Sequence, residues 1–86
     1  MIFDKDKFTA VELDLINEYV DKNKGILTKT KDGRRDKFFI SSDSLSACIR
    51  IKNMEERTIF VCVKVFDIYY DYWVTTPPQL KKALGL

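Results

Sequence analysis

The sequence lacks histidine entirely and has only two cysteines and three glycines among its 86 residues. Hydrolytic or transfer chemistry needs a nucleophile with a base, paired carboxylates or metal ligands, and none of these constellations is present. Without histidine, two cysteines cannot complete a structural zinc site. The glycines are scattered, each explained by a turn or a helix end, so they form no phosphate-binding loop. We therefore expect a protein that is not an enzyme and that holds no metal ion and no cofactor.

Long apolar runs are also absent. No run approaches the roughly 20 residues of a membrane-spanning helix, and none follows a basic N-terminus as in a signal peptide. We therefore expect a cytoplasmic protein without a membrane partner. In a reducing cytoplasm, Cys48 and Cys62 are expected to remain thiols rather than to bridge. The chain has room for one hydrophobic core, so residues 1–86 are expected to form a single domain.

The strongest structural signal is an alternating pattern between Leu45 and Phe66, which predicts a β-hairpin with its loop at residues 53–57. In one register every pair on one face is apolar: Leu45/Val65, Ala47/Val63, Ile49/Val61 and Ile51/Ile59. The other face then holds Ser46/Lys64, Cys48/Cys62, Arg50/Phe60 and Lys52/Thr58. A slip of one residue would bring Ile and Val against Lys, Arg and Ser, so the alternation selects this register. We expect the apolar face to build the core and the other face to be available for function.

A helix is predicted over residues 9–24. Thr9 and Glu12 have the spacing of a capping box, and Gly25 is expected to supply the left-handed residue that ends the helix. The apolar residues recur at helical spacing and are expected to cover the sheet: Val11, Leu15, Ile16, Tyr19 and Val20.

Residues 26–40 predict a second hairpin. Asp32-Gly33 is a preferred pair for a two-residue type I′ turn, which would place Lys29 opposite Asp36. A three-residue loop would instead oppose Lys29 to Lys37, and like charges across a sheet are destabilising. We therefore expect the register of the two-residue turn.

The C-terminal part predicts a further strand and a short helix. Residues 68–75 are rich in Tyr, Trp and Val, which indicates either a strand buried on both faces or an interface. Thr76-Pro77-Pro78-Gln79 combines a helix cap with proline at the first helical position, so a helix is expected over residues 77–84, ending at Gly85. The predicted fold is α+β: a four- or five-stranded antiparallel meander with one long N-terminal helix on the core face and a short C-terminal helix.

Basic residues are concentrated in one part of the chain. Residues 21–37 hold seven basic against three acidic residues, whereas residues 1–20 hold five acidic against two basic. Single-stranded nucleic acid binding requires cations for the phosphates and an aromatic ring for base stacking, and RNA is the expected ligand. The predicted nucleic-acid-binding residues are Lys29, Lys31, Arg34, Arg35, Lys37, Arg50, Lys52, Phe60 and Lys64. The same charges would also keep an exposed sheet soluble, so both interpretations stay open.

A second hypothesis uses the aromatic residues of the fifth strand. Tyr and Trp are enriched at the centres of protein interfaces. The predicted interface residues are Tyr69, Tyr70, Tyr72 and Trp73. Binding through them would make the chain a protein-binding inhibitor or adaptor, or a homodimer, without nucleic acid.

The Lys-, Asp-, Ile- and Tyr-rich composition, the segment KFFISSDSL and the ending DYWVTTPPQLKKALGL resemble the small early accessory proteins of T-even-type bacteriophages. One of those proteins is an RNA-binding inhibitor of a type III toxin endoribonuclease. The resemblance lies in length and composition across the whole chain and assigns no residues. It implies a cytoplasmic counter-defence protein that antagonises a host factor, with RNA as ligand or as bridge.

Overall fold

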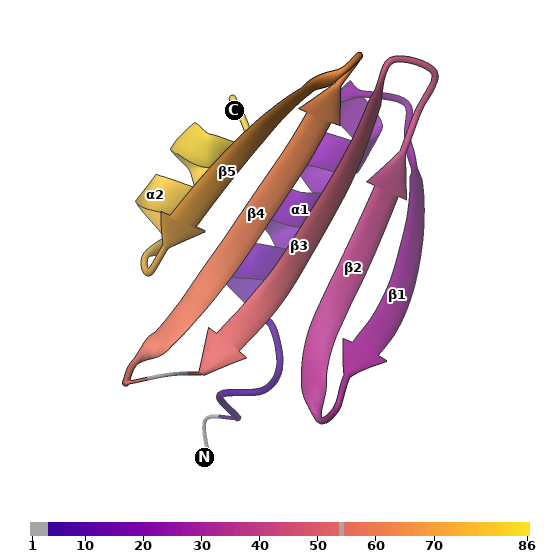
Figure 1. Ribbon diagram of the computed structural model, residues 1–86. Helices are drawn as coiled ribbons and strands as arrows, with labels where there is room; N and C mark the ends of the chain where they lie inside the picture. Colours follow the sequence, from indigo (N-terminus) through magenta and orange to yellow (C-terminus); the bar gives the residue numbers. More distant parts are fainter. Residues whose placement is uncertain (1–3, 54) are drawn as a thin grey trace.

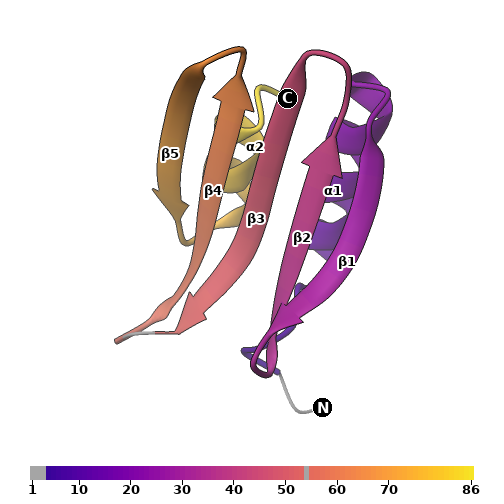
Figure 2. The same cartoon turned by 45° about the vertical axis from the view of Figure 1, so that its right-hand side comes forward.

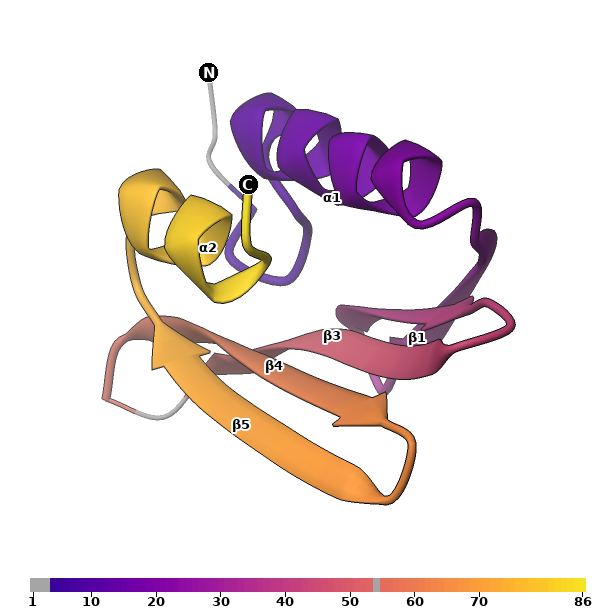
Figure 3. The ribbon, with the colours of Figure 1, turned by 90° about the horizontal axis from the view of Figure 1, so that it is seen from above.

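The computed structural model describes residues 4–53 and 55–86, which adopt an α+β fold. Five strands form one antiparallel sheet in chain order, as Figure 1 shows. Both helices lie on the same face of that sheet (Figure 3). The elements are α1 (Ala10–Lys22), β1 (Ile26–Asp32), β2 (Arg35–Ser41), β3 (Leu45–Asn53), β4 (Arg57–Val65), β5 (Ile68–Val74) and α2 (Pro77–Ala83). The predicted fold class is confirmed, and the fifth strand is present.

The central hairpin has the predicted register from Leu45↔Val65 to Lys52↔Thr58. Asn53 and Arg57 also pair, so the loop is one residue shorter at each end than expected; Met54, in that loop, lies outside the described residues. The apolar face of this hairpin is buried beneath the helices, with Ile49, Ile51 and Val61 fully inaccessible: Ala47, Ile49, Ile51, Ile59, Val61 and Val63. Burying each larger aliphatic side chain contributes about 1.5–3 kcal/mol, so this ladder is the main source of the core.

Helix α1 begins with the predicted capping box. The Thr9 N–H donates to Glu12 Oε1 at 2.8 Å, and the Glu12 N–H donates to Thr9 Oγ1 at 3.3 Å. Its apolar face differs from the prediction at the first turn, where Val11 is 55% exposed and Glu12 is buried. The reason is that this turn faces Arg57 of β4, which pairs with the Glu12 carboxylate.

The end of α1 also differs from the prediction. The left-handed residue is Lys24, with φ 52°, and Gly25 does not have a positive φ. Gly25 is needed for space instead, because a Cβ there would lie 2.9 Å from Cγ2 of Ile40 and 3.3 Å from the carbonyl oxygen of Ser41. The chain therefore passes close to the end of β2 as it enters β1.

The register predicted for the second hairpin is wrong by two residues. Lys29 pairs with Phe38 and Lys31 with Asp36, and the two-residue turn is Gly33-Arg34. Gly33 has φ 65° whereas Arg34 has no positive φ, which is the pattern of a type II′ turn and not of type I′. A two-residue shift leaves every side chain on the same face, so hydrophobic alternation does not distinguish the two registers.

The C-terminal helix α2 follows the prediction closely. Thr76 and Gln79 form a second capping box, Pro77 is the first helical residue, and Gly85 follows the helix with φ 70°. Leu80 and Leu84 are buried against the core. Neither helix in the described part of the chain has the length and apolar character needed to cross a bilayer.

The turn between β4 and β5 holds Phe66 in a strained position. Val65 pairs with Ile68, and Phe66 has φ 56° with 79% of its surface exposed. A left-handed conformation costs a residue with a Cβ about 1–2 kcal/mol, and Asn tolerates it better than Phe. We expect Phe66→Asn to raise the free energy of unfolding by about 0.5–1 kcal/mol in a urea titration.

The control for that prediction is Asp67→Asn at the next position, where φ is not positive. This change should leave the free energy of unfolding within about 0.5 kcal/mol of the original, as exposed substitutions usually do. Equal effects of the two changes would contradict the assignment of strain to Phe66.

Candidate nucleic-acid interface on the open sheet face

The sheet has one face covered by both helices and one face that no described element covers, which we call the open face. Figure 2 shows the five strands in front with the helices behind them. Because side chains alternate along a strand, the residues that flank the buried ladder point to the open face. They include cations, aromatic rings, two thiols and a carboxylate: Arg35, Lys37, Phe39, Cys48, Arg50, Lys52, Phe60, Cys62, Lys64, Tyr69, Asp71 and Trp73.

Four of these residues lie in one row across the sheet, which we call the central row: Lys37 on β2, Arg50 on β3, Phe60 on β4 and Trp73 on β5. Each is the direct cross-strand partner of the next. The Arg50 guanidinium carbon lies 5.5 Å from the centre of the Phe60 ring. The Phe60 and Trp73 ring centres are 4.5 Å apart with 48° between their planes. The row therefore runs from cations to aromatic rings without interruption.

Two further aromatic rings flank the central row, and each has a lysine over it. Phe39 is 43% exposed, with Lys37 Nζ 5.1 Å from its ring centre. Tyr69 is 64% exposed, with Lys64 Nζ 5.6 Å from its ring centre. Trp73 is 59% exposed. The open face thus presents accessible rings beside cations at both ends of the sheet.

Arg50 is the most central cation of the open face and is incompletely paired. Its Nη1 lies 3.9 Å from Asp32 Oδ2, beyond hydrogen-bond distance. Its Nε is buried without a hydrogen-bond partner among the described residues. The guanidinium therefore keeps unused donor capacity, held in place by the Phe60 ring beneath it.

The structure divides the predicted nucleic-acid-binding residues between two faces. Arg35, Lys37, Arg50, Lys52, Phe60 and Lys64 reach the open face, and Arg34 lies exposed in the turn beside it. Lys29 and Lys31 lie on the helix-covered side, opposite Phe38 and Asp36. Lys29 Nζ lies 5.9 Å from the Phe38 ring centre, and Lys31 forms an ion pair with Asp36.

The predicted protein-interface residues are divided as well. Tyr69 and Trp73 point to the open face, whereas Tyr70 and Tyr72 point to the side of the helices. Phe39 also lies on the open face, although it was not among the residues predicted from the sequence. The tandem Phe38-Phe39 carried the signal, because two adjacent strand residues point to opposite faces and only one of them can enter the core.

Cys48 and Cys62 lie opposite each other on the open face, as the hairpin register predicted. Burial raises the pKa of the Cys48 thiol. A hydrogen bond to Asp71, together with burial, raises the pKa of the Cys62 thiol. Both are free thiols that stay protonated at neutral pH. The described residues contain no group of three or more potential ligands that could hold a metal ion.

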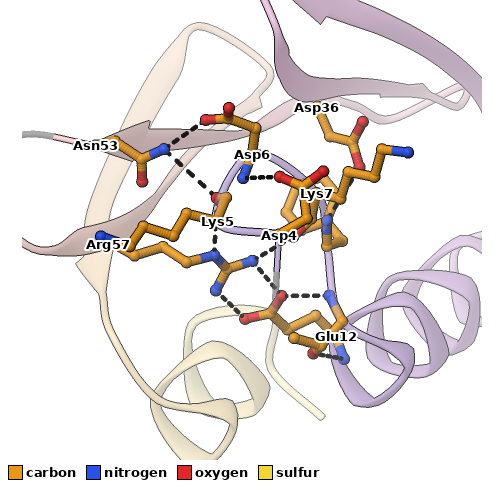
Figure 4. Close-up of polar contacts among 10 residues, drawn as sticks. Asp4, Lys5, Asp6, Lys7, Glu12, Asp36, Asn53 and Arg57 are labelled. Carbon is orange, nitrogen blue, oxygen red and sulfur yellow. Dashed lines mark hydrogen bonds and ion pairs between the residues drawn. The ribbon is translucent and has the colours of Figure 1, made fainter. Parts of the chain in front are cut away.

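A second polar cluster joins the N-terminal loop to the sheet, shown in Figure 4. The Arg57 guanidinium donates to both carboxylate oxygens of Glu12, at 2.6 and 2.7 Å, and to the carbonyl oxygens of Lys5 and Lys7. Asn53 donates to Asp6 Oδ1 at 2.6 Å. Glu12 is only 3% exposed. The Arg57 guanidinium and the Asn53 amide thus bond to partners within the chain, so the cluster fastens residues 5–12 to β3 and β4.

Acid pH should destabilise the protein through this cluster. Burial would raise the pKa of Glu12, but hydrogen bonds from Arg57 and from the Thr9 N–H outweigh it and hold that pKa below 4.5. For Asp36, burial is likewise outweighed by hydrogen bonds from Lys31 and the Phe8 N–H, so its pKa lies below 3.8. The folded chain therefore binds fewer protons than the unfolded chain, and stability is lost as pH falls from about 4.5 through the folded pKa values.

Urea unfolding at a series of pH values between 2 and 7 measures this loss. Glu12→Gln removes one of the two carboxyls, so its free energy of unfolding should fall less steeply below about pH 4.5 than that of the original chain. Parallel curves for the two proteins would contradict the role assigned to Glu12.

No protein-family model, no curated protein and no solved structure matches this chain. The resemblance to phage accessory proteins therefore stays a prediction, and function has to be argued from the open face itself.

Proposed function

We propose that the open face binds single-stranded nucleic acid, with RNA as the favoured ligand. The observation that supports this most is the central row, in which Lys37 and Arg50 continue directly into Phe60 and Trp73. Proteins that bind single strands combine cations along the backbone with aromatic side chains on which bases stack. An uncovered sheet face with accessible rings suits unstacked bases better than a rigid duplex.

The geometry suggests a different role for each ring. Phe60 and Trp73 already touch, with centres 4.5 Å apart, so no base fits between them. A base stacks instead on the exposed ring of Trp73 or of Phe39, while Phe60 supports Trp73 and orients Arg50. The phosphates contact the open-face cations Arg35, Lys37, Arg50, Lys52 and Lys64.

The proposed biochemical role is occlusion. The open face carries rings and cations and no pair of groups suited to cleaving a phosphodiester, so a bound strand would be held and hidden and not processed. A small protein of this kind inhibits another factor by competing for its RNA or by binding to it through that RNA.

The single tryptophan makes the test specific. Trp73 fluorescence should change on titration with a twelve-nucleotide single-stranded RNA at low salt, and duplex RNA should compete poorly. Lys37→Glu, on the open face, should weaken binding several-fold. The matched change Lys29→Glu, on the other face of the neighbouring strand, should leave it nearly unaltered. No fluorescence change at low salt, or equal weakening by both variants, would overturn the proposal.

A further inference from the structure

The two edge strands of the sheet, β1 and β5, differ in the charge of their exposed residues. The β1 edge carries Lys29 and Lys31, both exposed, and charged edge residues discourage pairing with another chain. The β5 edge has six exposed residues out of seven and a single charge, Asp71. Among the described residues no strand pairs with the outer edge of β5. Its backbone N–H and C=O groups on that side are therefore open to a further strand.

A pocket of about 620 Å³ adjoins this edge, between β5 and α2. Figures 1 and 3 show β5 as the outermost strand with α2 beside it. From the strand it is lined by Asp71, Tyr72, Trp73 and Val74, and from the helix by Gln79, Lys82 and Ala83. The lining is thus largely aromatic and aliphatic, with polar groups from Asp71 of the strand and from Gln79 and Lys82 of the helix.

We propose that the β5 edge binds an extended segment of another protein by strand addition. The added segment places an apolar side chain in the pocket and an acidic side chain beside Lys82. In such complexes backbone hydrogen bonds supply affinity, and pockets for alternate side chains supply specificity. This site lies at the edge of the sheet and shares Asp71 and Trp73 with the open face, but peptide binding there does not depend on nucleic acid.

The charges beside the edge support an acidic partner. The last turn of α2 carries Lys81 and Lys82, of which Lys82 lines the pocket, and the first turn carries no acidic residue. Asp71 is also among the lining residues, but its side chain points to the open face, where its carboxylate accepts a hydrogen bond from the Cys62 thiol. The helix side of the β5 edge is therefore positive, and an acidic segment is attracted to it.

A second copy of this chain fits the edge less well. Asp71 is the middle residue of β5, so antiparallel pairing of two copies about their centres would set one Asp71 opposite the other. Like charges directly opposite each other are destabilising in a sheet.

The probes are capped heptapeptides, acetyl-Thr-Val-Thr-X-Thr-Glu-Thr-amide, in which X is Phe, Leu or Tyr. Their alternate residues present one apolar and acidic face, as the pocket requires. At least one should bind saturably below 1 mM in isothermal titration. Replacing its Glu by Lys should weaken binding about three- to tenfold, because an exposed ion pair becomes a repulsion. Methylating one set of alternate amide nitrogens should abolish binding, and methylating the other set should spare it.

Two matched variants test where the acidic side chain of the peptide contacts α2. Lys82→Glu should reverse the preference between the Glu and Lys peptides, whereas Lys81→Glu, next to it but outside the pocket, should retain it. The proposal is overturned if no peptide binds, if both methylated sets bind equally, or if Lys82→Glu leaves the preference unchanged. It is also overturned if sedimentation shows a dimer held together by β5, since a second copy would then occupy the edge. None of these experiments contains nucleic acid, so a negative result would contradict strand addition at β5 without affecting the open-face proposal.

Discussion

Arg57→Ala is expected to lower the free energy of unfolding by about 3–5 kcal/mol, a large part of the stability of a domain this small. The change removes both hydrogen bonds to the Glu12 carboxylate, which is 3% exposed and would be left buried with its charge unpaired. It also removes donors from the carbonyl oxygens of Lys5 and Lys7. Urea unfolding at pH 7 measures the effect.

A double-mutant cycle with Glu12→Gln separates the buried charge from the lost packing. The glutamine keeps an oxygen for the Thr9 N–H and carries no charge. Arg57→Ala should therefore cost about 2 kcal/mol less in the Glu12→Gln background than in the original chain. Lys81→Ala, an exposed change outside the cluster, should shift stability by less than about 0.5 kcal/mol. Additive effects of Arg57→Ala and Glu12→Gln would contradict the pairing.

Replacing Phe39 and Trp73, the two exposed rings on which bases are proposed to stack, should nearly abolish nucleic acid binding. Stacking contributes about 1–3 kcal/mol per base, so Phe39→Leu with Trp73→Leu is expected to weaken binding of a labelled single-stranded RNA by about 100-fold or more, measured by fluorescence anisotropy. The matched control is Tyr70→Leu with Tyr72→Leu on the helix side of β5, which should stay within threefold of the original. Similar losses in both pairs would show that the rings act through the fold and not through bases.

The salt dependence of the same titration reports on the cations. The slope of log affinity against log salt for a single strand is about −0.7 per phosphate contact. Arg50→Gln should make the slope shallower by about that amount, because the Arg50 guanidinium is held on the open face with unused donor capacity. If Arg50→Gln leaves the slope unchanged, Arg50 does not contact a phosphate of the bound strand.

The central hairpin could be predicted residue by residue because its two faces differ in polarity. A slip of one residue between Leu45 and Phe66 would have buried Lys and Arg, so the pattern excludes that slip. Alternation does not exclude a slip of two residues in either hairpin, and the register predicted at 26–40 was wrong by two. The register of the hairpin at 26–40 follows from the turn, where Gly33 takes the first position and not the second, and from the ion pair between Lys31 and Asp36.

The candidate site was predictable in part for the same reason. The assignment of Arg50, Lys52 and Phe60 to one face followed from the central hairpin. Joining them to Lys37 and Trp73 required the pairing of β3 with β2 and of β4 with β5, which local patterns do not encode. The burial of Glu12 could not be predicted from local patterns either, because its partner Arg57 is 45 residues away in the chain.

The most direct test of the open-face proposal is photo-crosslinking to a single-stranded RNA that carries 4-thiouridine, with the attached residues located by mass spectrometry. We predict crosslinks at Phe39, Tyr69 and Trp73, whose rings are exposed on the open face. Free lysine in solution and a chain carrying Lys37→Glu serve as controls for specificity. Crosslinks concentrated at Tyr70 and Tyr72, on the helix side of the same strand, or an absence of crosslinks at low salt, would contradict the proposal.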